Sequence, residues 1–296
     1  MLFKRYENNP VISPNPDKDY ESKFTYNPAA IAHANKFYLI YRAEGDSGVS
    51  TLCLATSKDG YKFEKHENNP VIRPSLPEEK QGCEDPRITK IGDKFYMTYT
   101  SYDGMYPERS ENINTSLATS KDLIHWKKHG IILKGIKSAA LFSEKIKGRY
   151  FMFIGGKKIR IATSKNLFDW KLEKKILLNV RKGMFDDRYV ETGPPPFVFR
   201  NKLVLFFNTS DWKKNFQPSI ALLDKDDPHK IIYRADKPIM SPNKEFELHG
   251  KVNNVIFGTG LVEFNRVYFY YYGGADKYVC VATIKKPELE KYFSSL

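Results

Sequence analysis

The chain has 296 residues, of which 41% are hydrophobic and 14% aromatic, enough for one large all-β domain or two ordinary domains. Its net charge of +13 suggests a nucleic-acid partner, but the 48 basic residues are mixed with 35 acidic ones and form no basic arm. No stretch is long and apolar enough for a membrane span or a signal peptide, and the three cysteines are widely spaced. We therefore expect a cytoplasmic protein with no disulfide framework, metal site, membrane contact or nucleic-acid partner.

A basic residue followed by a short, mostly aromatic run occurs five times along the chain. Such runs predict β-strands, because Tyr and Phe favour pleated, half-buried surfaces. The copies start roughly 53 to 64 residues apart, a spacing typical of an array of supersecondary units. The five copies are residues 36–41, 94–99, 149–154, 202–207 and 266–271.

Two further patterns accompany these runs. Leu/Ile-Ala-Thr-Ser-Lys-Asp/Asn occurs three times and reads as a strand ending in a turn, twice closed by a strand that contains a tryptophan, Trp126 or Trp170. Weaker echoes follow the fourth and fifth runs. Asn-Pro-Val-Ile occurs at residues 9–12 and 69–72, with a partial copy at 238–240, and marks an outer strand or a link between units.

Five repeats of short strands with turn signals predict an all-β fold, a five-bladed β-propeller that forms a single domain over residues 1–296. One blade cannot bury both faces of its sheet, whereas radially stacked blades cover one another. A β-sandwich would explain the strands but not the fivefold pattern. Only residues 286–296 read as helical, and we expect this short amphipathic tail to brace the ring.

Residues 82–87, Gly-Cys-Glu-Asp-Pro-Arg, place two carboxylates and a guanidinium within four positions. We interpret this stretch as a turn that leads into the second aromatic run, with Pro86 restricting Asp85 to extended backbone. Taken alone, it would describe a surface turn in which Asp85 pairs with Arg87. The repeats instead place it at the mouth of the second blade.

Polar residues flank the other aromatic runs as well. The spacing puts Asp85, Glu191 and Asp276 at the mouths of three blades, where they converge on a central funnel. Carboxylates surrounded by amides, guanidinium groups and aromatic rings suit a sugar, and a pair of them can supply an acid and a base at a glycosidic bond. The surrounding substrate-binding residues are expected to be Asn27, Arg42, Glu84, Arg87, Tyr102 and Asn208.

These motifs resemble glycoside hydrolase family 130, whose members are β-mannoside phosphorylases and β-mannosidases on a five-bladed propeller. The resemblance covers about residues 9–282 and rests on residues 27–29, 41–43, 55–60, 82–87, 193–196 and 274–276. It implies that Asp85 is the general acid of an inverting mechanism and relays its proton through a mannose hydroxyl. It also implies which residues hold the mannose on the non-reducing side of the cleaved bond, namely Asn27, Arg42, Arg87 and Asp276.

At the positions expected to bind the nucleophile, this chain differs from the phosphorylases of the family. Those carry a phosphate-binding Arg after the third run and a His after the fourth, where this chain has Gly155-Gly156 and Asn208-Thr209. Glu191 stands where they have a small residue. A carboxylate there would repel a phosphate dianion but could deprotonate water.

We therefore predict an exo-acting, inverting β-mannosidase that acts on β-1,2-linked or related mannosides and releases mannose. Glu191 is the expected base and Glu247 the second candidate. An inverting acid and base should stand roughly 6.5–9.5 Å apart, with water between them.

Several alternatives stay open at this point. Lys145, Arg160 and Arg188 could rebuild an anion site, which would suit a phosphorylase that makes mannose 1-phosphate with inorganic phosphate as co-substrate. A non-catalytic sugar-binding propeller would keep the funnel without the chemistry. Propeller glycosidases of arabinans or xylans would be expected to carry a catalytic carboxylate where this chain has Asn27. No cofactor is expected, and homo-oligomerisation is left open.

Overall fold

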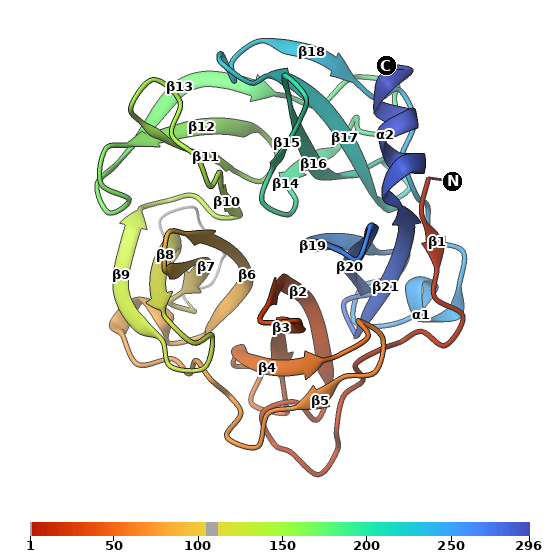
Figure 1. The fold of residues 1–296 in the computed structure, drawn as a ribbon. Coiled ribbons are helices and arrows are strands. Elements are labelled where there is room, and N and C mark those ends of the chain that lie inside the picture. Colours follow the sequence, from red (N-terminus) through yellow and green to blue (C-terminus); the bar gives the residue numbers. More distant parts are fainter. Residues whose placement is uncertain (1, 105–111) are drawn as a thin grey trace.

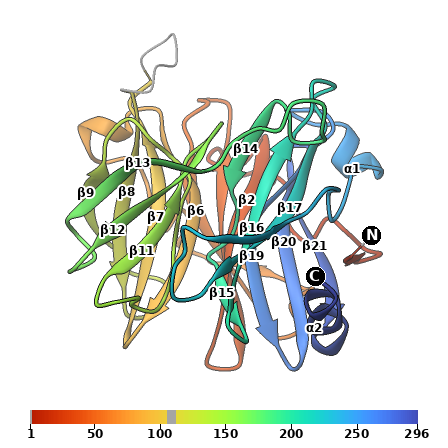
Figure 2. The ribbon, with the colours of Figure 1, turned by 90° about the horizontal axis from the view of Figure 1, so that it is seen from above.

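Five antiparallel sheets stand around a central axis in the computed structural model, which describes residues 2–104 and 112–296 (Figure 1). The predicted five-bladed propeller is confirmed. In four of the blades the chain runs from an innermost strand at the axis to an outer strand at the rim, and the strands stand roughly along the axis (Figure 2).

The strands follow one another blade by blade. The first blade consists of β2 (Phe24–His33), β3 (Lys36–Glu44), β4 (Thr51–Ser57) and β5 (Glu64–Lys65). The second consists of β6 (Gly82–Ile91), β7 (Lys94–Tyr102), β8 (Ile113–Ser120) and β9 (Lys127–Leu133), preceded by the short 3-10 helix η1 (Pro77–Glu79). The third consists of β10 (Ala139–Leu141), β11 (Tyr150–Ile154), β12 (Ile159–Ser164) and β13 (Trp170–Leu178).

The last two blades complete the ring. The fourth consists of β14 (Tyr189–Thr192), β15 (Phe197–Phe199), β16 (Lys202–Ser210), β17 (Phe216–Asp224) and β18 (Ile231–Arg234). The short helix α1 (Glu245–Leu248) then leads into the fifth, which consists of β19 (Ile256–Phe264), β20 (Val267–Gly274), β21 (Tyr278–Lys285) and the N-terminal strand β1 (Lys4–Arg5).

The five aromatic runs form the second strand of each blade, β3, β7, β11, β16 and β20. Their side chains alternate between the two faces of the sheet and fill the space between neighbouring blades. Phe37 of the first blade meets Phe269 of the fifth edge to face, with ring centroids 4.8 Å apart and an angle of 64° between the ring planes. Such edge-to-face contacts add to the apolar burial that holds the blades together.

The two ends of the chain close the ring at the fifth blade. Lys4 and Arg5 pair with β21, so the N-terminus supplies the outer strand of the blade that the C-terminus completes. The expected helical tail is α2 (Lys286–Ser294), in which Leu289 and Phe293 are buried in the same cluster as Phe3. Among the described residues, no helix has the length and apolar character needed to cross a membrane.

The repeated Ser-Lys-Asp/Asn pattern forms a hydrogen-bonded turn. The Ser120 hydroxyl accepts from the backbone N–H of Asp122 and Leu123, and the Trp126 indole donates to the Leu123 carbonyl at 3.1 Å. Ser57 and Ser164 form equivalent turns. The pattern recurs because the first three blades reverse the chain at the same place, at the end of their third strand.

The Asn-Pro pattern fastens the links between blades. The Asn69 amide donates to the Leu54 carbonyl at 2.9 Å and accepts from the Leu54 N–H at 2.7 Å. Asn9 makes the same two-way contact with Val281 in the fifth blade. The partial copy at residues 238–240 bonds to β17 through its backbone. The pattern therefore marks links that run along an outer edge of a blade, as predicted.

Replacing Asn69 tests this fastening. We expect Asn69→Ala to lower the free energy of unfolding by about 1–3 kcal/mol, because it leaves the buried N–H of Leu54 unpaired and leaves the Leu54 carbonyl with the backbone N–H of His66 as its remaining donor. The exposed neighbour provides the control, since Asn68→Ala should change stability by less than about 0.5 kcal/mol. Urea unfolding measures both, and equal effects would contradict this role for Asn69.

Candidate active site

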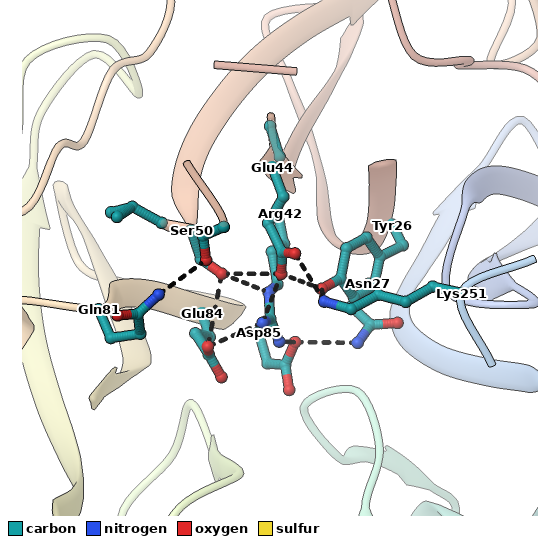
Figure 3. Close-up of polar contacts among 12 residues, drawn as sticks. Tyr26, Asn27, Arg42, Glu44, Ser50, Gln81, Glu84, Asp85 and Lys251 are labelled. Atoms are coloured by element: carbon teal, nitrogen blue, oxygen red, sulfur yellow. Dashed lines mark hydrogen bonds and ion pairs between the residues drawn. The ribbon is translucent and has the colours of Figure 1, made fainter. Parts of the chain in front are cut away.

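The innermost strands and the ends of the second strands bring several of the expected residues to one end of the axis. Asn27, Arg42, Glu84 and Asp85 form a single hydrogen-bonded group there (Figure 3). Asp276, which follows β20, lies close enough for the charge of Asp85 to act on it. The structure therefore brings five of the expected residues together from three blades.

Asp85 and Asn27 both sit at bulges in an innermost strand. The stretch at residues 82–87 belongs to strand β6, so the predicted turn is wrong, and Asp85 has φ +47° rather than an extended backbone. The pairing of β6 with β7 skips Asp85 and Pro86, which lets the chain take this left-handed conformation. Asn27 has the same φ at the corresponding bulge of β2.

The two bulges aim their side chains at each other. The Asn27 amide donates to Asp85 Oδ1 at 2.9 Å across the boundary between the first and second blades (Figure 3). A left-handed conformation costs a non-glycine residue about 1–2 kcal/mol. Strained backbone of this kind persists where the surroundings fix it, and it is common at functional sites.

Arg42 lies at the centre of three carboxylates. Its Nη2 is 2.6 Å from Glu44 Oε1 and 2.7 Å from Glu84 Oε1, and its Nη1 is 3.4 Å from Asp85 Oδ1. The guanidinium also lies 4.8 Å from the centre of the Tyr26 ring. These contacts leave the side chain only 13% exposed and fix its position.

Glu44 and Lys251 belong to the same group but were not predicted from the sequence. Lys251 Nζ lies 2.6 Å from Glu44 Oε2, and the Tyr26 hydroxyl donates to Glu44 Oε1. Burial disfavours the charged carboxylate, but Arg42 and Lys251 outweigh it and lower the pKa of Glu44 to about 2. Glu44 could have been found, because alternation puts residues 42 and 44 on the same side of β3. No sequence pattern identifies Lys251.

The carboxylates of the site are tuned in opposite directions. Burial opposes the charge of Asp85, but the positive charges of Arg42, Lys137 and Arg87 hold its pKa below the usual value. For Asp276, burial and the nearby charge of Asp85 raise the pKa to about 7. The site therefore favours the ionised form of Asp85 and holds the proton of Asp276 more tightly than it would be held in water.

Glu191 lies on β14 of the fourth blade and is buried. The hydroxyl of Ser138 donates to Glu191 Oε1, and that of Tyr189 donates to Oε2. Burial and the charge of Glu191 raise the pKa of Tyr189 well above its ordinary value, so the phenol keeps its proton. Each carboxylate oxygen has two lone pairs, so Glu191 can still accept a hydrogen bond from a water molecule.

Arg87 connects the two carboxylate-bearing strands. Its Nη1 donates to the Asp85 carbonyl at 2.8 Å, and Nη2 and Nε donate to the Thr192 and Gly193 carbonyls at 2.7 and 3.2 Å. The predicted contact with mannose therefore has to compete with three backbone acceptors. This geometry gives Arg87 a positioning role between Asp85 and Glu191.

Asn208 and Tyr102 also lie at the expected strand ends. Asn208 is fully buried, and its amide makes a two-way contact with the backbone of Gly258, at 3.0 Å as donor and 2.9 Å as acceptor. It therefore ties the fourth blade to the fifth. Tyr102 is half-buried at the end of β7, where it pairs with Gly82.

Glu247 does not belong to this group. It lies on α1 at the outer edge of the fifth blade, where Arg5 binds both of its oxygens at 2.6 and 2.9 Å (Figure 1). The Tyr272 hydroxyl and the backbone N–H groups of residues 243 and 244 donate to it as well. With these partners, the Glu247 carboxylate holds the N-terminal strand in place at a distance from the funnel. The prediction of Glu247 as the second candidate base is therefore wrong.

The three cations considered for an anion site do not converge. Lys145 lies in the hairpin between β10 and β11, where it packs on Tyr150, whereas Arg160 follows the opposite end of β11. Arg188 donates to the Ser210 hydroxyl at 3.1 Å in the fourth blade.

Comparison with known proteins places the chain in a family. The model of glycoside hydrolase family 130, described as β-1,4-mannooligosaccharide phosphorylase, matches residues 3–294. The chain is 35% identical to β-1,2-mannobiose phosphorylase of Thermoanaerobacter sp. (strain X514), over 97% of this chain and 98% of that protein. It is 34% identical to 1,2-β-oligomannan phosphorylase of the same strain, over 98% and 99%.

A solved structure gives a similar result. This structure is 29% identical to the chain, with a TM-score of 0.87 and coverage of 96% of this chain and 94% of the other. It is described with the finding that the family of mannoside phosphorylases contains glycoside hydrolases that target β-1,2 mannosidic linkages in Candida mannan.

The raised pKa of Asp276 predicts how stability changes with pH. The folded value of about 7 exceeds the ordinary 3.8, so the folded protein holds the proton more tightly and loses stability as pH rises from about 4 to 7. Asp276→Asn removes this titration. We expect its unfolding free energy, relative to that of the parent protein, to rise by about 2–3 kcal/mol between pH 5 and pH 8.

Urea unfolding at the two pH values measures this difference. Asp93→Asn, at an exposed turn, is the control and should show no such rise. A pH-independent difference for Asp276→Asn would show that the Asp276 carboxyl titrates normally.

Proposed function

The chain is an enzyme of glycoside hydrolase family 130, and from this premise we propose that it is an inverting, exo-acting β-mannosidase that hydrolyses β-1,2-linked mannosides to mannose. The observation that carries the proposal is Glu191, a buried carboxylate on the funnel wall that Ser138 and Tyr189 hold in one orientation. The guanidinium of Arg87 lies near both proposed reacting groups, since the charges of Asp85 and Glu191 both act to raise its pKa.

The proposed attack uses water activated by Glu191. A lone pair of the carboxylate accepts a proton from water while the water oxygen bonds to the anomeric carbon. The negative charge of Glu191 favours a neutral nucleophile and repels a phosphate dianion. Ser138 and Tyr189 fix the carboxylate, so it does not need to reorient during the reaction.

The leaving oxygen receives its proton on the side of Asp85. A mannose hydroxyl passes its own proton to the glycosidic oxygen and takes one from Asp85, after which the carbon–oxygen bond is broken. Asp85 is ionised in the free site, so it must take up a proton when the sugar binds. Displacement of water by the sugar favours this uptake, because it desolvates the carboxylate.

Phosphorolysis is the second candidate function. It is favoured by the two relatives of 35% and 34% identity, both of which are phosphorylases of β-1,2-mannosides. In that reaction phosphate would replace water and yield mannose 1-phosphate. The observation that weighs against it is the buried carboxylate of Glu191, whose negative charge would repel a phosphate dianion.

A product assay separates the two functions. We expect β-1,2-mannobiose to be converted to mannose at a rate that does not depend on inorganic phosphate. Mannose 1-phosphate that forms only when phosphate is present would establish the second candidate instead. Binding of the disaccharide without any cleavage would identify a sugar-binding propeller.

The role of Glu191 predicts a loss of turnover without a loss of binding. We expect Glu191→Gln to lower kcat by about 10²–10⁴-fold, because general-base catalysis contributes that much. The dissociation constant for β-1,2-mannobiose, measured by calorimetry, should change less than threefold. The control is Glu245→Gln, at a surface carboxylate that is 87% exposed. An active Glu191→Gln variant would exclude Glu191 as the base.

A further inference from the structure

A cleft of about 640 Å³ lies on the third blade, directly beside the proposed reacting groups. It begins at Gly156 and Tyr189 near the axis and extends outward to Lys174 and Ile176 on β13. The cleft extends over β12 and β13, two neighbouring strands that lie about 5 Å apart. It is therefore large enough for more than one chemical group of a ligand.

The cleft is lined by basic side chains. Lys157 and Lys158 lie in the link after Gly155-Gly156, Arg160 lies on β12, and Lys174 lies on β13. Lys137 joins them from the segment before β10. No Asp or Glu is among the lining residues in the described parts of the chain, and the nearest carboxylate to the inner end, Glu191, lies behind Gly156 and Tyr189.

The cleft differs from the neighbouring site around Asp85, where cations and carboxylates are paired. In that site Arg42 is paired with Glu84 and Lys251 with Glu44, whereas the cleft holds the half-buried Arg160 and three exposed lysines. The structure gives no ion pair to Lys157, Lys158, Arg160 or Lys174 within the described parts of the chain. These four like charges lie in one hollow, where they create a positive potential that attracts an anionic ligand.

The inner end of the cleft touches the proposed reacting groups. Gly156 pairs with Glu191 through a backbone bridge, and the hydroxyl of Tyr189 donates to the same carboxylate. The positive charge of Lys137 acts on Asp85 and Glu84. A saccharide whose cleaved bond lies between Asp85 and Glu191 can therefore extend into the cleft.

We propose that this cleft binds the leaving-group side of the substrate and that this side carries a phosphate monoester, so that the preferred substrate is a phosphorylated manno-oligosaccharide. The inference rests on the proposed hydrolytic function. A phosphate monoester has about −1.5 to −2 charges at neutral pH, which matches several lysines better than a single carboxylate does. The guanidinium of Arg160 can bind two of its oxygens at once.

Free inorganic phosphate has the same chemistry, but its position would differ. Glu191 borders the cleft at Gly156, with Oε2 only 3.6 Å from where a side chain at that position would begin. Phosphate ions in the cleft would have to pass this carboxylate to reach the anomeric carbon. A phosphate group attached to the leaving sugar stays in the cleft and does not have to pass Glu191.

The test compares β-1,2-mannobiose with the same disaccharide carrying a phosphate monoester on its reducing-end mannose. We expect the parent enzyme to show at least a tenfold lower KM for the phosphorylated form and a similar kcat. The difference should shrink as salt is raised, because salt screens the charges. Arg160→Gln combined with Lys174→Gln should remove most of it.

The matched control lies on the same strand. Lys175 follows Lys174 on β13 but does not line the cleft, so Lys175→Gln should keep the preference. Equal KM values for the two substrates in the parent enzyme, or a preference that survives the double substitution, would overturn the inference while leaving hydrolysis intact.

Failure of the proposed function has a different signature. If mannose 1-phosphate forms from inorganic phosphate and the double variant loses this reaction, the cleft holds free phosphate and both proposals are overturned. If neither disaccharide is cleaved, hydrolysis is overturned. The affinities of the two disaccharides, measured by calorimetry, then test the role of the cleft separately from hydrolysis. Equal affinities would overturn the proposal that the cleft binds a phosphate monoester.

Discussion

The buried guanidinium of Arg42 is the interaction on which the rest of the site depends. It contacts three carboxylates, those of Glu44, Glu84 and Asp85, that would otherwise repel one another in a region with little water. Its charge keeps the pKa of Asp85 low, whereas burial raises the pKa of Glu84 above its usual value. One cation therefore allows several acidic groups to share the funnel in different protonation states, which is the condition for acid and base chemistry in one place.

The backbone supports this electrostatic arrangement. Asp85 and Asn27 keep left-handed conformations at matching bulges, and their side chains bond across the boundary between two blades. Arg87 then joins the Asp85 carbonyl to the carbonyls of Thr192 and Gly193, directly after Glu191. The backbone segments that carry the two proposed reacting groups are thus tied together by one buried side chain, that of Arg87. The ring makes such contacts available, because its innermost strands all meet at one axis.

Much of the fold could be predicted because its signals are local and repeated. An aromatic run needs only its own residues to favour a strand, and the turn at Ser120 is closed by residues within six positions of it. Five copies of these signals define five blades, and the polar residues next to them mark the funnel. Asp85, Asn27 and Arg42 were found in this way. Glu44 was accessible by the same reasoning, since it lies two residues beyond Arg42 on the same strand.

The sequence by itself determined the blades, the end of the ring that carries polar groups and the residues with the right chemistry to stand there. Only the tertiary structure decided which partners each of these residues has. Glu191 and Glu247 are both buried glutamates, but Glu247 is occupied by Arg5, 242 residues away, whereas Glu191 is held by two hydroxyls beside the axis. The low pKa of Asp85, the high pKa of Asp276 and the gathering of lysines on the third blade likewise depend on partners that are distant along the chain. Charge and solvation act through space, so no local pattern can specify them.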